Sequence, residues 1–282
     1  MALSIFSNIP SLNTQRQLTK TQNALSANLG RLSSGLRINN AGDDAAGLAI
    51  SEKLRAQIRS LAQAERNAND GISLLQTAEG AMNEVSGMLT RMRELAIQAA
   101  NATVGSVERG FINQEFAALR DEITRISTVT NFNGTQLIDG TYSVTQLRFQ
   151  VGIGGTANDA IMVNLADVRA TALGSGAGNQ ITNRDLTTSN TAVAALATLD
   201  AAITDVSVSR ASIGAVENRL QVTIANLASS RENLSAATSR IRDVDVAEET
   251  AAMTRNNILL QAGVSVLAQA NQLPALALQL LK

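Results

Sequence analysis

The chain of 282 residues is long enough for one or two domains with a sizeable core, and its 23 basic and 24 acidic residues leave a net charge of −1. Hydrophobic residues make up 45% of the chain but aromatic residues only 2%, so the apolar content is mostly Ala, Leu, Ile and Val, which favours long, slim helices. The even charge, without a basic block or an aromatic stacking platform, excludes nucleic acid as an expected partner.

Two residue types are missing from the sequence. Without His and Cys, the chain lacks the commonest general base near neutral pH, the thiolate nucleophile, the usual zinc ligands and any disulfide. Lys occurs only at positions 20, 53 and 282, and no motif frames it as a catalytic group. Carboxylate pairs, serine with lysine, or an all-oxygen metal site remain open on composition, but we expect a protein that is not an enzyme and holds no metal and no cofactor.

The sequence carries no recognisable targeting segment. Its first residues, "MALSIFSNIPSLNTQRQ", lack the basic region and the apolar run of a secretory signal. No stretch approaches the ~20 uninterrupted apolar residues that span a bilayer. The sequence alone predicts no membrane insertion, and a cytosolic chain unless it leaves the cell by a route that cleaves no signal.

The N-terminal segment, residues 1–42, carries an apolar ladder at helical spacing. Its members are Leu18, Leu25, Leu29, Leu32 and Leu36. About 40 residues in helical form would extend roughly 60 Å.

Residues 43–130 predict a long helix followed by a shorter one. Asp43 and Asp44 suit the N-cap and first turn of the long helix. From Leu54 to Ala99, ladder residues recur at steps of four and three, the spacing of a coiled-coil-like seam. After an interruption at Gly105, a shorter ladder follows, made of Ile112, Phe116, Leu119, Ile123 and Ile126.

Residues 131–190 predict a small β insert rich in Gly, Thr and Asn. "TQLRFQVGIG" alternates with Leu147, Phe149, Val151 and Ile153 on one face, and "NDAIMVNL" supplies a partner strand. Asn133-Gly134 and Asp139-Gly140 are turn signals, and "LGSGAGNQ" predicts a loop.

The C-terminal third predicts two more helices. In residues 191–240, a strict heptad position holds Val206, Ile213, Leu220 and Leu227, and it continues to Leu234 and Ile241. In residues 241–282, a second ladder reaches almost to the last residue through Leu260, Val264, Leu267, Asn271, Pro274, Leu278 and Leu281.

The two terminal segments have similar lengths, which predicts that they pair. We expect a mainly α fold, a long coiled-coil-like helical hairpin or bundle of paired N- and C-terminal helices with a small β-hairpin insert. A two-helix hairpin buries only one stripe of each helix, so further apolar surface needs other copies to cover it. We expect the termini to be largely disordered in the monomer and to fold on polymerising.

Four stretches resemble bacterial flagellins in sequence, order and distance from the chain ends. They are "LSSGLRINNAGDDAAGLAI" (32–50), "RMRELAIQAAN" (91–101), "NFNGTQLIDG" (131–140) and "SRIRDVDVAEE…ANQLPALALQLL" (239–281). The resemblance implies a structural subunit that is exported by the flagellar type III route and polymerises outside the cell into the helical flagellar filament for swimming motility. It also implies a homopolymer, an export chaperone at the C-terminal region, and contacts with the filament cap and hook-associated proteins.

The resemblance also assigns roles to individual residues. The terminal ladders would build the inner coiled coil of the filament, through Leu18, Leu25, Leu29, Leu32, Leu36, Leu260, Val264, Leu267, Leu278 and Leu281. Gly42, Asp43, Asp44 and Gly47 would form a rigid joint between inner and outer shells, in which the two glycines allow a close backbone approach. A capped helix start is the simpler explanation, and both can hold at once. Arg91, Leu95 and Glu115 match positions for subunit contact and for recognition by a host Toll-like receptor. The alternative is that Leu95 is an ordinary exposed leucine.

Three other functions compete with a filament subunit. A hook–filament junction protein shares the terminal coiled coil, but the matches at 91–101 and 239–281 favour a flagellin. A membrane-active translocator needs a longer apolar segment than any in the chain. An enzyme needs a larger central region with paired chemical groups.

Overall fold

The computed structural model describes residues 7–174 and 180–279, with side chains as far as Gln272. The chain forms two compact units, which we call the terminal unit (Met1–Ile58 and Glu232–Lys282) and the central unit (Arg59–Arg231). Helices α2 (Ala45–Ala100) and α5 (Ser189–Arg242) contribute to both units. The predicted division of the chain into five segments stays a prediction.

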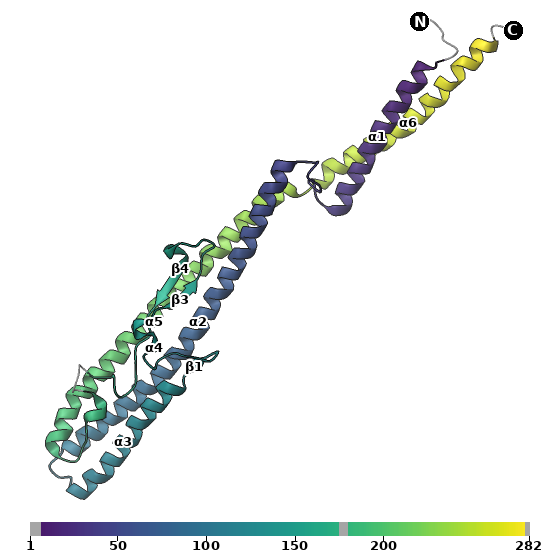
Figure 1. The fold of residues 1–282 in the computed structure, drawn as a ribbon. Coiled ribbons are helices and arrows are strands. Elements are labelled where there is room, and N and C mark those ends of the chain that lie inside the picture. The colour runs from purple at the N-terminus through teal and green to yellow at the C-terminus, as the bar shows by residue number, and fades with distance from the viewer. Residues whose placement is uncertain (1–6, 175–179, 280–282) are drawn as a thin grey trace. The chain divides into compact units, whose positions relative to one another are not determined.

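The terminal unit is built around a helical hairpin, in which α1 (Ile9–Ser34) lies beside α6 (Val246–Gln279) (Figure 1). The two helices are antiparallel, because Asn8 at the start of α1 donates a 2.8 Å hydrogen bond to the carbonyl of Ala270, far along α6. At the other end of α1, Gly35 has φ +70, the left-handed conformation that commonly ends a helix. The predicted pairing of the terminal segments is confirmed for the described residues.

The segments next to this hairpin also pair. The backbone N–H of Arg37 donates to the carbonyl of Arg242 over 2.7 Å, and that of Val244 donates to Gly35 over 3.1 Å. Leu36 and Asp243 form an antiparallel β-bridge at the same place. These bonds satisfy backbone groups at the ends of the two helices, which the helices themselves leave without partners.

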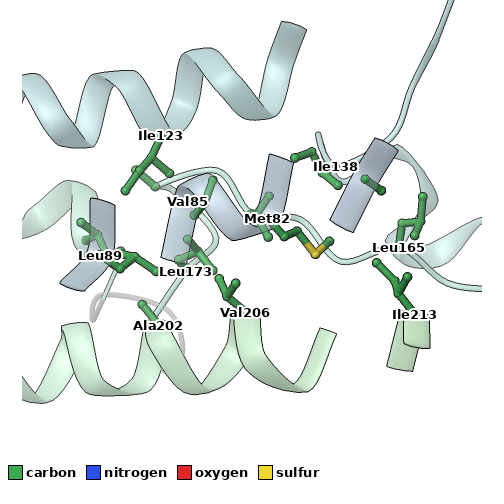
Figure 2. Packing of buried hydrophobic residues seen from close by; sticks show 14 of the residues in the cluster. Met82, Val85, Leu89, Ile123, Ile138, Leu165, Leu173, Ala202, Val206 and Ile213 are labelled. Carbon is green, nitrogen blue, oxygen red and sulfur yellow. The ribbon is translucent and has the colours of Figure 1, made fainter. Parts of the chain in front are cut away.

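The central unit packs parts of α2 and α5 with α3 (Ser106–Val129). The predicted long ladder lies in α2 and the predicted heptad in α5, and both turn inward: Met82, Leu89, Val206 and Ile213 are at most 1% exposed. Figure 2 shows Val85 and Leu89 of α2 lying beside Ile123 of α3. The spacing of apolar residues therefore predicted the core helices correctly.

The predicted β insert is confirmed as two short antiparallel hairpins. The first pairs β1 (Asn131–Phe132) with β2 (Thr135–Gln136) across the predicted Asn133-Gly134 turn, where both turn residues have positive φ. The second pairs β3 (Leu147–Gln150) with β4 (Ala160–Val163).

Short elements in the insert differ from the expectation. The strand ends at Gln150, so Ile153 lies outside it and is 47% exposed. A four-residue helix, α4 (Thr141–Val144), follows the predicted Asp139-Gly140 turn, and two short 3₁₀ turns occupy Ala157–Asp159 and Ile181–Asn183. The predicted loop from Leu173 falls largely on residues 175–179, outside the described residues.

Irregular segments also enter the core of the central unit. Ile138, Leu165 and Leu173 lie between the helices and are at most 2% exposed (Figure 2). Backbone bonds fix this covering segment, as the N–H of Val168 donates to the carbonyl of Ile138 over 3.2 Å. The insert thus completes a core that three narrow helices alone would leave open.

Within the described residues, α5 is the one helix long and apolar enough, by composition, to cross a bilayer, with a window of mean hydropathy 1.4. Its apolar residues include Leu199, Ala202 and Val206, which are fully buried in the central unit. A helix that serves as a protein core meets the same test of length and composition.

Candidate assembly surfaces

The seam of the terminal hairpin contains polar residues. On α1 the two buried residues are Thr21 and Asn28, which are 8% and 7% exposed. Asn256 of α6 donates a long hydrogen bond of 3.4 Å to the side chain of Asn28. A polar residue at a seam position of paired helices selects one register at a cost in stability.

A small residue lets the two helices approach closely at Leu18. A Cβ on Gly263 of α6 would lie 3.2 Å from Cγ of Leu18. Ala270, one further heptad along, is 6% exposed. Ser11, Thr14, Leu18, Thr21, Leu25, Asn28 and Leu32 continue one seam at steps of three and four, of which the leucine ladder showed only a part.

The structure separates the predicted ladder residues into two groups. Six of them are half-buried along or next to the seam: Leu18, Leu25, Leu32, Leu36, Leu260 and Leu267. Leu29 and Val264 are 52% and 56% exposed, so they lie off the seam of the hairpin, and their place in the inner coiled coil of the filament stays a prediction. The side chain of Leu278 is not among those described, and Leu281 lies outside the described residues.

Large apolar side chains are exposed on the outer faces of the hairpin, among polar residues. On α1, Ile9 and Leu12 are 59% and 54% exposed, and on α6 Ile258, Leu259 and Val266 are at least 50% exposed. A shallow groove of 560 Å³ follows α6 past Ile258 and Leu259. Several large apolar side chains exposed on one hairpin indicate an interaction surface.

The segment before α2 is held by two aspartates with different roles. Asp44 caps α2, since its carboxylate accepts a 2.9 Å hydrogen bond from the N–H of Gly47. Asp43 instead accepts from the N–H groups of Asn40 and Asn39, at 2.9 and 3.1 Å. These bonds, with that of Asn40 the stronger, lower the pKa of Asp43.

The two predicted joint glycines also differ. A Cβ on Gly47 would meet the carboxylate of Asp44 first and come within 2.8 Å of Cδ1 of Ile38, so a larger residue at this site would force these side chains to shift. A Cβ on Gly42 would meet nothing within 4 Å, and the expectation that Gly42 allows a close backbone approach is wrong. Ile38 is 2% exposed and anchors this segment.

An ion pair stabilises the segment before α2 and its neighbour at the end of α5. Arg242 Nη1 lies 2.7 Å from Oε1 of Glu52, and Arg37 donates a 2.7 Å hydrogen bond to the carbonyl of Ile241. The hydrogen bond from Arg242 lowers the pKa of Glu52. Arg37, Glu52 and Arg242 were not singled out from the sequence, because nothing in it brings positions so far apart together.

The structure brings Arg91 and Glu115 together at the surface. Leu95 does not join them there, because it is buried. Arg91 lies between Glu94 and Glu115, with ion-pair distances of 3.0 and 2.9 Å, and these two partners raise its pKa. Leu95 is 1% exposed and belongs to the core of the central unit. Its description as an exposed leucine is therefore wrong: on α2 it lies next to Ala96 in a buried stripe wider than one ladder.

Within residues 7–174 and 180–279, no group of three or more acidic side chains is arranged to hold a metal ion. The features that stand out are surfaces for contact with other macromolecules.

Comparison with known proteins identifies the family. A sequence profile described as "Bacterial flagellin N-terminal helical region" matches residues 5–143, and one described as "Bacterial flagellin C-terminal helical region" matches residues 196–281. The chain is 48% identical to "Flagellin" of Bacillus subtilis (strain 168), over 98% of each chain. It is 47% identical to "Flagellin" of Halalkalibacterium halodurans, again over 98% of each.

A solved structure shares the fold. A flagellar hook-associated protein from Vibrio parahaemolyticus aligns with a TM-score of 0.61 at 17% identity, covering 71% of this chain and all of the other. That likeness concerns the fold alone and does not favour the junction function. Because both profiles and the curated relatives match the chain nearly from end to end, the chain belongs to the bacterial flagellins.

Proposed function

We propose that the terminal hairpin is the part of this filament subunit that neighbouring copies complete. As a flagellin, the chain is a structural subunit that polymerises into the extracellular flagellar filament for motility. The observation that carries our proposal is the exposure of Leu29, Val264 and Ile258 on a hairpin whose seam is already closed. Copies that cover these side chains gain ~25 cal/mol for each Å² of apolar surface removed from water.

The role assigned to the chain is mechanical rather than chemical. Its contacts are heterologous, meaning that different surfaces of two copies meet, and a contact of this kind that does not close produces an open helical polymer. A junction protein that stays at one level of a flagellum would not elongate. No feature of the described residues favours that alternative.

Electron microscopy after seeding with filament fragments tests the proposal. We expect the full chain to elongate the seeds into long filaments, and a variant lacking residues 1–42 and 241–282 to remain monomeric. Elongation by the shortened chain would contradict the proposed role of the terminal hairpin. Short stubs from the full chain would support a junction protein instead.

We further propose that an export chaperone covers the C-terminal helix before secretion by the flagellar type III route. The groove on α6 supports this, because it exposes Ile258 and Leu259 beside the small residues Ala247 and Ala251. Ile258→Asp should abolish co-purification with the cognate chaperone, while the exposed Val107→Asp, on the central unit, should leave it intact. Equal losses from both variants would contradict the proposal.

We also propose that Arg91 and Glu115 form a surface for subunit contact and for recognition by a host Toll-like receptor. Leu95 would support this surface from the core beneath it. The exposed ion pair supports this role, and Arg91→Ala should weaken signalling in receptor-bearing cells without unfolding the monomer. Contacts with the filament cap and hook-associated proteins are proposed from the family alone.

A further inference from the structure

Ion pairs connect α2 and α5 at intervals along the central unit, where the two helices lie side by side (Figure 1). Glu65, Glu79 and Arg93 occupy every fourteenth position of α2, two heptads apart and so close to one stripe of the helix. The outer two have partners of opposite charge on α5. Arg231 lies 2.8 Å from Glu65, and Asp200 lies 2.6 Å from Arg93.

The middle position differs, because an acid on α2 lies opposite another acid on α5. From the Glu65 pair, fourteen residues forward along α2 lead to Glu79, and fourteen residues back along the antiparallel α5 lead to Glu217. Arg210, seven residues before Glu217 on α5, supplies a base. Its Nη2 lies 3.5 Å from Oε1 of Glu79, a longer distance than in the ion pairs on either side. The middle position thus combines two acids with one base.

Burial makes the charge on Glu217 costly. Its Oε1 and the Nε of Arg210 are buried and have no hydrogen-bond partner within the described part of the chain. A buried polar atom that lost its water and gained no partner destabilises the fold, and more so when it is charged. Glu79, in contrast, is 37% exposed and has Arg210 as its partner. Of the two acids, Glu217 therefore gains more from binding a proton.

The surroundings of the two acids are otherwise neutral. One turn before and one turn after Glu79, α2 carries Gln76 and Asn83. Arg219 lies only two residues from Glu217 on α5, but residues at that spacing do not face each other, and Arg219 lines the groove beside the β3–β4 hairpin. The acid on α2 and the base two turns away are thus the charged groups that face Glu217 among the described residues.

We propose that Glu79 and Glu217 form a proton-operated contact between α2 and α5. With both carboxylates charged, this is the weak position in a row of cross-helix ion pairs. When Glu217 binds a proton from solvent, its hydroxyl donates a hydrogen bond to the carboxylate of Glu79, which keeps Arg210 as its counter-ion. One proton thereby brings the net charge of the three groups to zero. A fall in pH thus tightens the contact, and this property of the monomer does not depend on the proposed function.

The direction of the pH effect distinguishes this contact from an ordinary ion pair. Burial, and then the charge of Glu79, raise the pKa of Glu217 above its ordinary value of 4.5. The folded chain therefore binds the proton more readily than the unfolded chain, and the contact gains stability as the pH falls from neutral toward 4.5. An acid whose pKa is lowered by a base behaves in the opposite way and loses its contribution as the pH falls through the lowered pKa.

Hydrogen exchange of the full-length monomer at pH 7 and pH 5, corrected for the intrinsic effect of pH on exchange, tests the contact. Amides 76–82 and 214–220 should gain about threefold in protection at the lower pH, the size expected of one partly exposed pair. In Glu217→Gln, the side-chain amide donates the same hydrogen bond without a proton, so the higher protection should be present at pH 7 already. A pH-dependent gain that persists in this variant, or no gain in the unmodified chain, would overturn the proposal.

Two further variants separate the contact from general effects of charge. Glu65→Gln removes an acid from the neighbouring ion pair of α2 and should leave the gain at amides 214–220 unchanged. Arg210→Gln removes the base and should enlarge that gain beyond about threefold, because two carboxylates then meet without a counter-charge. Loss of the gain in Glu65→Gln, or a gain in Arg210→Gln no larger than in the unmodified chain, would contradict the assignment to Glu79 and Glu217.

Discussion

The central and terminal units bury their apolar side chains to different extents. In the central unit, Leu75, Met82 and Leu89 are fully buried by helices and by irregular segments from the insert. In the terminal hairpin, α1 buries only Thr21 and Asn28 among its described side chains, while large apolar residues remain exposed. The central unit has the core of an independent domain, whereas the hairpin has a seam with apolar flanks. We therefore expect the central unit to fold alone, and we propose that assembly completes the hairpin.

A matched pair of leucine substitutions should give the largest contrast. Leu89→Ala removes a fully buried side chain from the central unit and should cost the monomer about 3–5 kcal/mol of unfolding free energy. Leu29→Ala removes a half-exposed side chain and should change the monomer by less than about 0.5 kcal/mol, yet impair filament growth. Denaturant unfolding of the monomer and seeded elongation measure the two effects. A large loss of monomer stability from Leu29→Ala would contradict the comparison.

The next largest difference should be between alanine substitutions at the two predicted joint glycines, Gly47 and Gly42. Gly47→Ala forces a methyl group toward Ile38 and should destabilise the terminal unit by about 1–3 kcal/mol. Gly42→Ala meets open space and should be neutral or slightly stabilising. Hydrogen exchange at amides 36–50, compared between the two variants, reads the difference. Equal effects would show that close packing is not what requires Gly47.

The polar seam offers a gain of stability. Replacing the contacting pair by Asn28→Leu with Asn256→Leu should strengthen the hairpin by about 1 kcal/mol, because an apolar seam outweighs a long amide hydrogen bond. Amides in α1 and α6 of the monomer should then exchange about fivefold more slowly. The same variant should assemble less faithfully, through loss of register control. Faster exchange would mean that the amide pair holds the hairpin together.

The smallest effects concern pH, and they have opposite signs in the two units. The pKa of Glu52 is lowered by Arg242, so this group stabilises the fold above its ordinary value of 4.5, and that contribution is lost as the pH falls. Burial, and then Glu79, raise the pKa of Glu217, so its cost appears as the pH rises above 4.5. At pH 7, Glu52→Gln should therefore lower stability and Glu217→Gln should raise it. At pH 3 both substitutions should have little effect, and unfolding curves at the two pH values provide the check.

Sequence periodicity and local turn signals predicted the parts of this fold that depend on residues close together in the chain. The heptad through Val206 and Ile213 and the hairpin turn at Asn133-Gly134 were read correctly, because local spacing and local backbone preferences determine them. The buried position of Leu95 was missed, because the covering segments widen the buried face of α2 beyond one stripe. The width of a helix's buried face depends on the segments that pack against it. The spacing of apolar residues along one helix does not reveal these segments.

The candidate surfaces were predictable only in part. The ladder predicted a hairpin but included Leu29 and Val264 and passed over Asn28, because an apolar ladder leaves out the polar residues of a seam. Asp44 as a cap was readable from its place before the helix. The Arg242–Glu52 ion pair and the Arg91–Glu115 ion pair needed coordinates, since each joins residues from different helices.

Hydrogen exchange of the monomer and the filament, followed residue by residue, tests the central claim most directly. We predict that amides in α1 and α6 exchange much faster than those around Met82 and Val206 in the monomer, and become protected in the filament. Protection of α1 and α6 in the monomer equal to that of the central core would contradict the claim that assembly completes the terminal unit.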